Sequence, residues 1–163
     1  MSGQPVRIAV LATGRFLLRS GVRAIEPVLL ETIGAAREEL HLAVYSMDDA
    51  AGRVLEAVRR AALRGVRCTV IVGNPGHRQG PFEGLLSLAE QVPHLRVVAF
   101  QDPDGGVLHA KVAVVDRRVA IVGSANLTRG GLAGNHEIAL LVEGEPAWQV
   151  AELLDGLTAG AGK

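Results

Sequence analysis

One short segment of this 163-residue chain holds His109, Lys111 and Asp116, and the first two of these residues can act on a phosphate. An imidazole can attack phosphorus or transfer a proton, and an ammonium group can hold the charge of a phosphate. Residues 107–116 are rich in valine and end in Asp-Arg-Arg, which predicts a β-strand that closes on a turn. Because side chains alternate along a strand, His109 and Lys111 are expected on one face. The segment therefore predicts a site for an anionic phosphate.

A second group of polar residues follows within 30 positions. The first part is Gly123-Ser124-Ala125-Asn126, and the second is Glu137. Together with Lys111, the Ser124 hydroxyl and the Asn126 amide can bind the non-bridging oxygens of a phosphate. Glu137 can accept a hydrogen bond from an imidazole nitrogen and fix its tautomer, as the third member of a triad does. The alternative for Glu137 is an exposed carboxylate at the end of a strand.

The pattern H-x-K-x4-D followed by G-S-x-N resembles the signature of the phospholipase D superfamily. The likeness extends to residues 24–72, with a helix, a strand that ends at Tyr45-Ser46, and a second helix before Arg-Gly-Val. The resemblance implies a covalent phosphohistidine that is released to water or an alcohol, with no metal and no cofactor. It also implies a catalytic set and two structural positions, Asp116 and Gly123. The catalytic set is His109, Lys111, Ser124, Asn126 and Glu137.

The chain carries this motif once, whereas the complete site of the family uses two. No other H-x-K occurs in the sequence. The resemblance therefore implies that a second copy supplies the second histidine, in a two-fold homodimer with one composite site. Small single-motif members of the family, of the bacterial endonuclease type, are built in this way.

Composition predicts a soluble globular protein, with 48% hydrophobic and 21% charged residues and a formal net charge of +0. We expect residues 1–163 to form a single catalytic domain. The apolar run from Ile8 to Ala12 is followed by Arg15 and Arg19, and no stretch reaches the roughly 18 apolar residues of a membrane span. We therefore expect a cytoplasmic protein. The lone cysteine, Cys68, excludes an internal disulfide and a cysteine zinc cluster, and its apolar surroundings predict a buried strand residue.

Periodicity and turn residues predict alternating strands and helices, then a run of strands. This order favours an α/β fold, a mixed β-sheet flanked by helices on both faces, as in the phospholipase D-like α-β-α sandwich. The loop 73–81 has no nucleotide P-loop pattern, although its His77 and Arg78 are candidates for substrate contact. The expected strands are 6–12, 41–47, 67–72, 95–100, 107–116, 119–122 and 137–142, and the expected helices are 24–40, 48–64, 82–92 and one from about 146, with 13–22 left unassigned.

The leading functional hypothesis is a metal-independent phosphodiesterase, a nuclease that acts on DNA or RNA without regard to sequence. The arginines along 53–67 and at 117, 118 and 129 favour it, and the neutral net charge does not. Aromatic residues make up only 3% of the chain, so base stacking is a poor prospect and backbone phosphates are the expected contacts. One alternative is a phospholipid hydrolase or phosphatidyl transferase. Another is a non-catalytic nucleic-acid-binding subunit of a larger complex, such as one for phage defence.

Overall fold

The computed structural model describes residues 5–19, 21–74 and 80–159. The described strands are β1 (Arg7–Thr13), β2 (Arg23–Ala24), β3 (Glu39–Val44), β4 (Arg67–Val72), β5 (Leu95–Ala99), β6 (Val112–Val115), β7 (Val119–Gly123) and β8 (Glu137–Glu143). The described helices are α1 (Arg15–Leu18), α2 (Ile25–Ala35), the 3-10 turn η1 (Asp49–Ala51), α3 (Gly52–Leu63), α4 (Pro81–Gln91), the π-helical turn η2 (Gly130–Gly134) and α5 (Glu145–Ala159).

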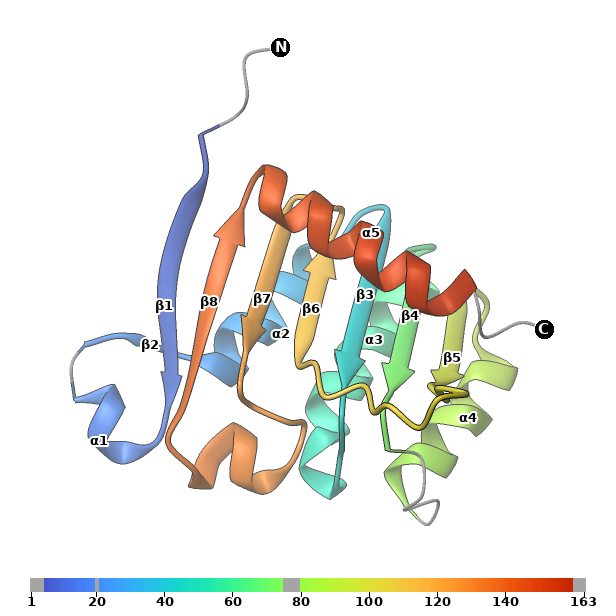
Figure 1. Ribbon diagram of the computed structural model, residues 1–163, viewed down its shortest axis with the longest axis horizontal. Coiled ribbons are helices and arrows are strands. Elements are labelled where there is room, and N and C mark those ends of the chain that lie inside the picture. Colours follow the sequence, from blue (N-terminus) through green and yellow to red (C-terminus); the bar gives the residue numbers. More distant parts are fainter. Residues whose placement is uncertain (1–4, 20, 75–79, 160–163) are drawn as a thin grey trace.

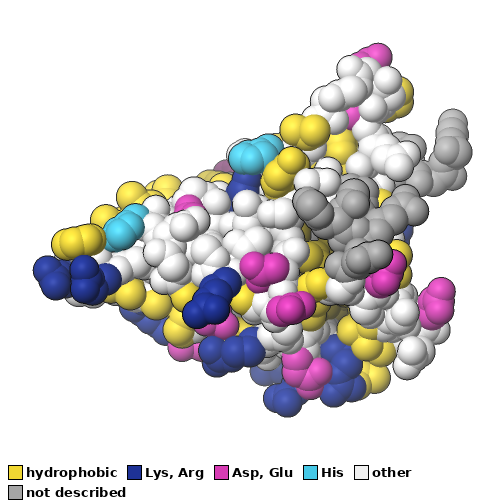
Figure 2. All heavy atoms as spheres, turned by 90° about the horizontal axis from the view of Figure 1, so that it is seen from below, with side chains coloured by type: hydrophobic (Ala, Val, Ile, Leu, Met, Phe, Trp, Pro, Cys, Tyr) yellow, Lys and Arg dark blue, Asp and Glu magenta, His cyan; other side chains and the backbone are white. Residues whose placement is uncertain are grey.

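All of these strands belong to one mixed sheet with the order β2-β1-β8-β7-β6-β3-β4-β5. Strands β3, β4 and β5 are parallel, and β3, β6, β7, β8 and β1 form an antiparallel succession. Helix α5 covers one face, and α2, α3 and α4 cover the other (Figure 1). The expected α/β fold, a mixed β-sheet flanked by helices on both faces, is therefore confirmed. The lower end of the sheet in Figure 1 faces the viewer in Figure 2.

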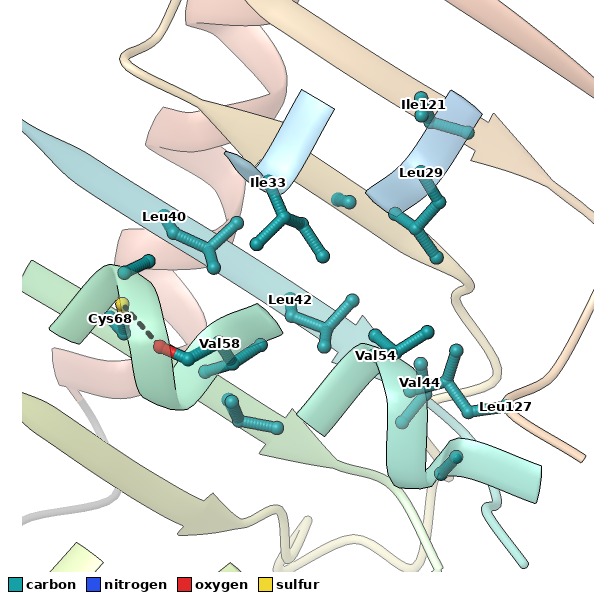
Figure 3. Packing of buried hydrophobic residues seen from close by; sticks show 14 of the residues in the cluster. Leu29, Ile33, Leu40, Leu42, Val44, Val54, Val58, Cys68, Ile121 and Leu127 are labelled. Atoms are coloured by element: carbon teal, nitrogen blue, oxygen red, sulfur yellow. Dashed lines mark hydrogen bonds between the residues drawn. The ribbon is translucent and has the colours of Figure 1, made fainter. Parts of the chain in front are cut away.

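The larger core lies between the sheet and α2, α3 and α4, and Figure 3 shows part of it. Ile33 from α2 and Val54 and Val58 from α3 are fully buried against Leu40 and Leu42 of β3. Burial of a side chain of this size contributes about 1.5–3 kcal/mol to folding. Strand β3 is buried along its whole length, as expected for a central strand with helices on both sides.

Cys68 lies on β4 within this core, at 1% exposure. Its thiol donates weak hydrogen bonds to the Val58 oxygen at 3.8 Å and the Val66 oxygen at 3.5 Å. Burial raises the pKa of the Cys68 thiol to about 12. The prediction that Cys68 is a buried strand residue is confirmed.

The second core lies between the sheet and α5. The small residues Ala147 and Ala151 let this helix approach the sheet closely, over Ala43, Ile71 and Val114. Helix α5 crosses the upper part of the sheet from β8 toward β5, so the lower parts of β1, β8 and β7 remain uncovered on that face (Figure 1).

Two predicted elements need correction. The predicted strand 107–116 is regular only over Val112–Val115, and residues 107–111 run as irregular chain across the lower end of the sheet. The predicted helix 24–40 ends at Ala35, because residues from Glu39 onward enter β3, so the apolar run had merged a helix with a strand. The segment 13–22, left unassigned, contains α1, and His77 and Arg78 lie outside the described residues.

Candidate active site

The polar residues singled out in the sequence gather at the lower end of the sheet in Figure 1. This end receives the carboxyl ends of β3 and β7 and the amino ends of β6 and β8. His109 and Lys111 directly precede β6, Ser124 directly follows β7, and Glu137 begins β8. Antiparallel pairing of three consecutive strands therefore places segments that lie 13 to 28 residues apart beside one another.

The closest contact of the site joins Lys111 to His109. The Lys111 Nζ atom lies 2.9 Å from Nδ1 and 3.2 Å from Nε2 of the imidazole, and it donates a hydrogen bond to the His109 carbonyl oxygen at 2.7 Å. The expected proximity of the two side chains is thus present, although the irregular backbone at 107–111 produces it rather than strand alternation. An ammonium group therefore adjoins the imidazole on the exposed end of the sheet.

The segment that carries His109 lies close over the end of β4. A Cβ atom added at Gly73 would lie only 2.0 Å from the Leu108 carbonyl oxygen. Since only glycine leaves room for so close an approach, Gly73 lets the chain at 107–110 pass across the sheet end. Leu108 itself is buried in the α5-side core, which fixes the residue just before the histidine.

Lys111 is a buried lysine, at 9% exposure. Its surroundings include a small apolar cavity lined also by Val44, Val112 and Leu127. Burial lowers the pKa of the Lys111 ammonium group, and the nearby Glu137 carboxylate opposes this shift. A weakly hydrated cation of this kind gains more from a bound phosphate than an exposed lysine would.

Ser124 and Glu137 are hydrogen-bonded to each other across β7 and β8. The Ser124 hydroxyl donates to Oε2 of Glu137, and Asn135 Nδ2 donates to Oε1 at 3.2 Å. The close packing of Gly123 supports this pair, since an added Cβ there would lie 2.5 Å from the Cβ of Ala139. Among the described residues, the Glu137 carboxylate accepts hydrogen bonds from Ser124 and Asn135, and its bond to an imidazole stays a prediction.

Asn126 lies in a loop that is tied to the end of β3. The Ser46 main-chain N–H donates to Asn126 Oδ1 at 3.4 Å, a long bond. The neighbouring Leu127 is buried, and its carbonyl accepts from the Asp48 N–H at 3.0 Å. The Asp48 carboxylate in turn accepts from the Arg129 N–H at 3.0–3.1 Å and caps η1 through Ala50. These bonds hold the asparagine amide at the same sheet end as the histidine.

Asp116 lies away from this group, at the opposite end of β6. Its backbone is left-handed, with φ of 51°. Its carboxylate accepts main-chain hydrogen bonds from Arg37, Glu38 and Glu39 at 2.8–3.2 Å. It thereby ties the β6–β7 turn to the start of β3, which is an anchoring role without contact to the histidine.

Tyr45 is a site residue that sequence reasoning did not assign. It follows β3, and its ring centroid lies 4.7 Å from that of His109 with 50° between the ring planes. The Lys111 Nζ atom lies 5.7 Å from the centre of the same ring. The signal available in the sequence was the chain's single tyrosine at the carboxyl end of a buried strand. Tyr45 walls the site on the β3 side and restrains the imidazole.

Two further observations concern the described residues alone. None of their His, Cys, Asp and Glu side chains form a group of three placed to hold a metal ion. None of their helices combines the length and the apolar character that crossing a bilayer requires.

Comparison with known proteins places this fold and motif in context. Residues 29–156 match the family described as "Cardiolipin synthase, PLD-like domain". The DISARM protein DrmC of Bacillus paralicheniformis is 29% identical over 129 residues, which are 78% of this chain and 53% of that protein. Cardiolipin synthase A of Pseudomonas aeruginosa is 34% identical over 119 residues, 71% of this chain and 23% of that protein. The chain thus spans about half or less of the length of these relatives.

Among solved structures, the chain resembles Nuc from Salmonella typhimurium, described as a phospholipase D family member. The TM-score is 0.77 at 19% sequence identity, and the superposition covers 95% of each chain. This likeness therefore includes nearly every element of the sheet and both helical layers.

Proposed function

Because this chain belongs to the phospholipase D superfamily, we propose that it is a phosphodiesterase that cleaves nucleic acid without sequence preference and without a metal ion. The observation that carries the proposal is the His109–Lys111 contact at an exposed sheet end, beside Ser124 and Asn126. A neutral imidazole is a competent nucleophile near neutral pH. The three neighbours supply a cation, a hydroxyl and an amide for the oxygens of the phosphate.

In the proposed reaction, an imidazole nitrogen of His109 attacks phosphorus and a P–N bond forms. The bond to the leaving oxygen breaks, and a second imidazole donates a proton to that oxygen. Water then attacks the phosphohistidine and gives its proton to the second imidazole, which releases His109 and restores the site. Lys111 holds the charge that develops on the non-bridging oxygens.

We infer that the second imidazole is His109 of a second copy, in a two-fold homodimer. Each chain contributes one histidine of this motif, whereas the reaction needs a nucleophile and an acid on opposite sides of phosphorus. An uncovered apolar strip on the α5 face of the sheet supports the inference. Its residues are Ile8 and Val10 on β1, Val122 on β7, and Ile138 and Leu140 on β8.

This strip is suited to a self-complementary contact. In the strand register Val10, Leu140 and Val122 lie side by side, and they are 51%, 41% and 39% exposed. Contiguous exposed apolar surface of this kind marks an interaction site more often than free surface. Val122 and Ile138 are one or two residues from Ser124 and Glu137, so a partner seated here borders the site.

Nucleic acid is the substrate favoured by the layout of the chain. The chain resembles the small single-motif members of the family, which are of the endonuclease type, and its fold matches that of Nuc over 95% of both chains. A phospholipid substrate is the second candidate, favoured by the matched family's description as a cardiolipin synthase domain. The match to DrmC favours a third, a nucleic-acid-binding subunit of a larger assembly.

One assay distinguishes these functions. Purified protein is incubated with single-stranded DNA, duplex DNA, RNA, phosphatidylcholine and cardiolipin, each with EDTA present, and His109→Ala serves as the inactive control. Cleavage of a nucleic acid by wild type alone supports the proposal. Turnover of lipid alone supports the second candidate, and binding without turnover supports the third. Loss of cleavage on chelation, restored by Mg²⁺ or Mn²⁺, contradicts the metal-independent mechanism.

A further inference from the structure

Helix α1 and its C-cap residue place two arginines around an aromatic ring. The Cζ atoms of Arg15 and Arg19 lie 5.2 and 5.4 Å from the centre of the Phe16 ring. Phe16 also stacks on His136, with 5.4 Å between centroids and 26° between planes. We call Arg15, Phe16, Arg19 and His136 the basic tip. It lies at the left-hand end of the molecule in Figure 2, where basic, hydrophobic and histidine side chains gather over α1.

The positive charge of the basic tip is not compensated. Within the described ranges, neither Arg15 nor Arg19 forms an ion pair with a carboxylate. The chain is neutral overall because it has 17 basic and 17 acidic residues, and seven of its arginines do form such pairs. Those seven are Arg7, Arg23, Arg53, Arg59, Arg60, Arg67 and Arg117. The two guanidinium groups of the tip are therefore available to an anion.

The basic tip is connected to the candidate site by close packing. A Cβ added at Gly14, which has φ of 98°, would lie 2.6 Å from the Asn135 oxygen and 2.9 Å from the His136 ring. Asn135 hydrogen-bonds to Glu137, and His136 lies between these two residues in sequence. Both tip and site also lie at the same end of the sheet (Figure 1).

We propose that the basic tip binds the phosphodiester backbone of a nucleic-acid strand beside the phosphate that is cleaved. The inference deepens the proposed function and rests on it. The cation–π contacts with Phe16 restrain the two guanidinium groups, whose N–H groups can still donate to phosphate oxygens. A polymer presents further phosphates on both sides of the cleaved one, whereas a phospholipid headgroup has none to extend along the surface.

The charges around the site also favour one direction for the bound nucleic-acid strand. A groove that Tyr45 also lines contains Asp48 and Asp49. Carboxylates repel phosphates, so a strand that leaves the site is favoured toward α1. Phe16 has a ring face against His136, and arginines approach the ring within 5.4 Å, so the tip is suited to backbone contacts rather than to base stacking.

The test compares two matched double variants. Arg15→Ala with Arg19→Ala removes the tip, and Arg37→Ala with Arg118→Ala removes the same charge from exposed positions beside Asp116, at the opposite sheet end. Both are made in the His109→Ala background. Binding of a fluorescent single-stranded oligonucleotide of about 20 nucleotides is followed by anisotropy across a range of salt concentrations.

The tip variant is expected to bind roughly tenfold more weakly at low salt and to lower the log–log salt slope by about 1.4, or 0.7 for each of two phosphates. The control pair should lower the slope less. Arg15→Lys with Arg19→Lys, which keeps the charge, should retain most of the slope. Equal affinities and slopes for the tip and control variants would overturn the inference, as would loss of the dimer in the tip variant. Lost binding to cardiolipin vesicles with oligonucleotide binding intact would make the tip a membrane contact instead.

A small substrate separates this inference from the proposed function. Bis(p-nitrophenyl) phosphate presents one phosphodiester and cannot reach α1. In the His109-containing proteins, removal of the tip should reduce oligonucleotide turnover far more than turnover of this compound. If wild type cleaves neither substrate, the proposed function fails, and the anisotropy result still decides the binding role. If wild type cleaves both substrates, and the ratio of oligonucleotide turnover to bis(p-nitrophenyl) phosphate turnover is the same in the tip variant, the tip proposal alone fails.

Discussion

The Nζ atom of Lys111 lies 2.9 Å from Nδ1 of His109 and donates a hydrogen bond to the main-chain oxygen of the same residue at 2.7 Å. These contacts join the two residues into one unit, in which the position of the cation and the position of the imidazole are set together. A phosphate that reaches the ring therefore meets the positive charge at once, with little further ordering of side chains.

We predict that His109→Ala lowers phosphodiester turnover by about a thousandfold or more, because it removes the proposed nucleophile and the proposed acid together. The side chain is exposed, so the melting temperature should stay close to that of wild type. Mixing wild type with excess His109→Ala, under conditions of subunit exchange, should silence hybrid sites. Full activity of a monomer at dilutions where no dimer is detected by mass would refute the composite site.

Lys111 should set an alkaline limit to activity. Burial lowers its pKa below the ordinary value near 10.4, and the charged form is the one proposed to bind phosphate. Activity should therefore fall as pH rises through this lowered pKa, earlier than for an exposed lysine. Lys111→Arg, which stays charged to higher pH, should remove that limb from whatever activity it retains. Wild-type kcat/KM that stays constant up to the ordinary lysine pKa would contradict this role.

The burial of Lys111, which is proposed to serve activity, lowers the stability of the fold. The unfolded chain binds the Lys111 proton more tightly than the folded chain, so this residue destabilises the fold below its lowered pKa, and the deficit shrinks as pH rises through it. Lys111→Met should consequently raise the melting temperature at neutral pH while it abolishes turnover. Thermal unfolding of wild type and Lys111→Met at neutral and alkaline pH measures the difference in melting temperature and its change with pH. A Lys111→Met protein less stable than wild type would show that the contacts of the ammonium group outweigh its desolvation.

Asp116 should act on stability more than on chemistry. Asp116→Ala leaves three main-chain N–H groups at residues 37–39 without their acceptor, which is expected to lower the free energy of unfolding by about 1.5–3 kcal/mol. Asp116→Asn keeps one acceptor oxygen and tolerates the left-handed backbone, so it should lose less. Urea unfolding provides the measurement. A larger loss of kcat than of stability at a temperature where both variants are folded would argue for a chemical role.

Cys68 should be inert in the native protein. Its thiol is buried and its pKa is raised to about 12, so almost no thiolate exists near neutral pH. Reaction with a disulfide reagent should be slow until guanidinium chloride unfolds the chain. Cys68→Ala should cost about 1–2 kcal/mol of stability and spare turnover. Fast modification before unfolding would mean that β4 opens locally.

The architecture followed from the sequence because its local signals agree. The apolar run at Arg67–Val72 gave β4 with its observed bounds, and Gly65 ends the preceding helix with φ of 94°. Asp48 begins the expected helix 48–64, and its carboxylate accepts from the Ala50 N–H at 2.8 Å as an N-cap does. The boundary between α2 and β3 was misplaced because both elements are apolar, and periodicity does not separate a buried helix end from a buried strand.

The site was less accessible to sequence reasoning because distant segments build it. Tyr45 reaches His109 only because β3 lies beside β6 in the sheet, which no local pattern specifies. The irregular course of residues 107–111 depends on the clearance over Gly73, a contact between segments 35 residues apart. Spacing along the sequence can identify the reactive residues, but the residues that surround and position them depend on the order of the strands in the sheet.

The pairing of β1 with β8 has a consequence for the newly made protein. Seven residue pairs join the first strand of the sheet to the last, and Thr13 is in register with Glu137. During translation β1 leaves the ribosome long before β8 is made. At about 5–20 residues per second, the β1 edge that pairs with β8 stays open for many seconds. Glu137 can be fixed only after the last strand emerges. A nascent fragment that ends before β8 would therefore lack Glu137 and would expose β1 and β7 as unpaired edges.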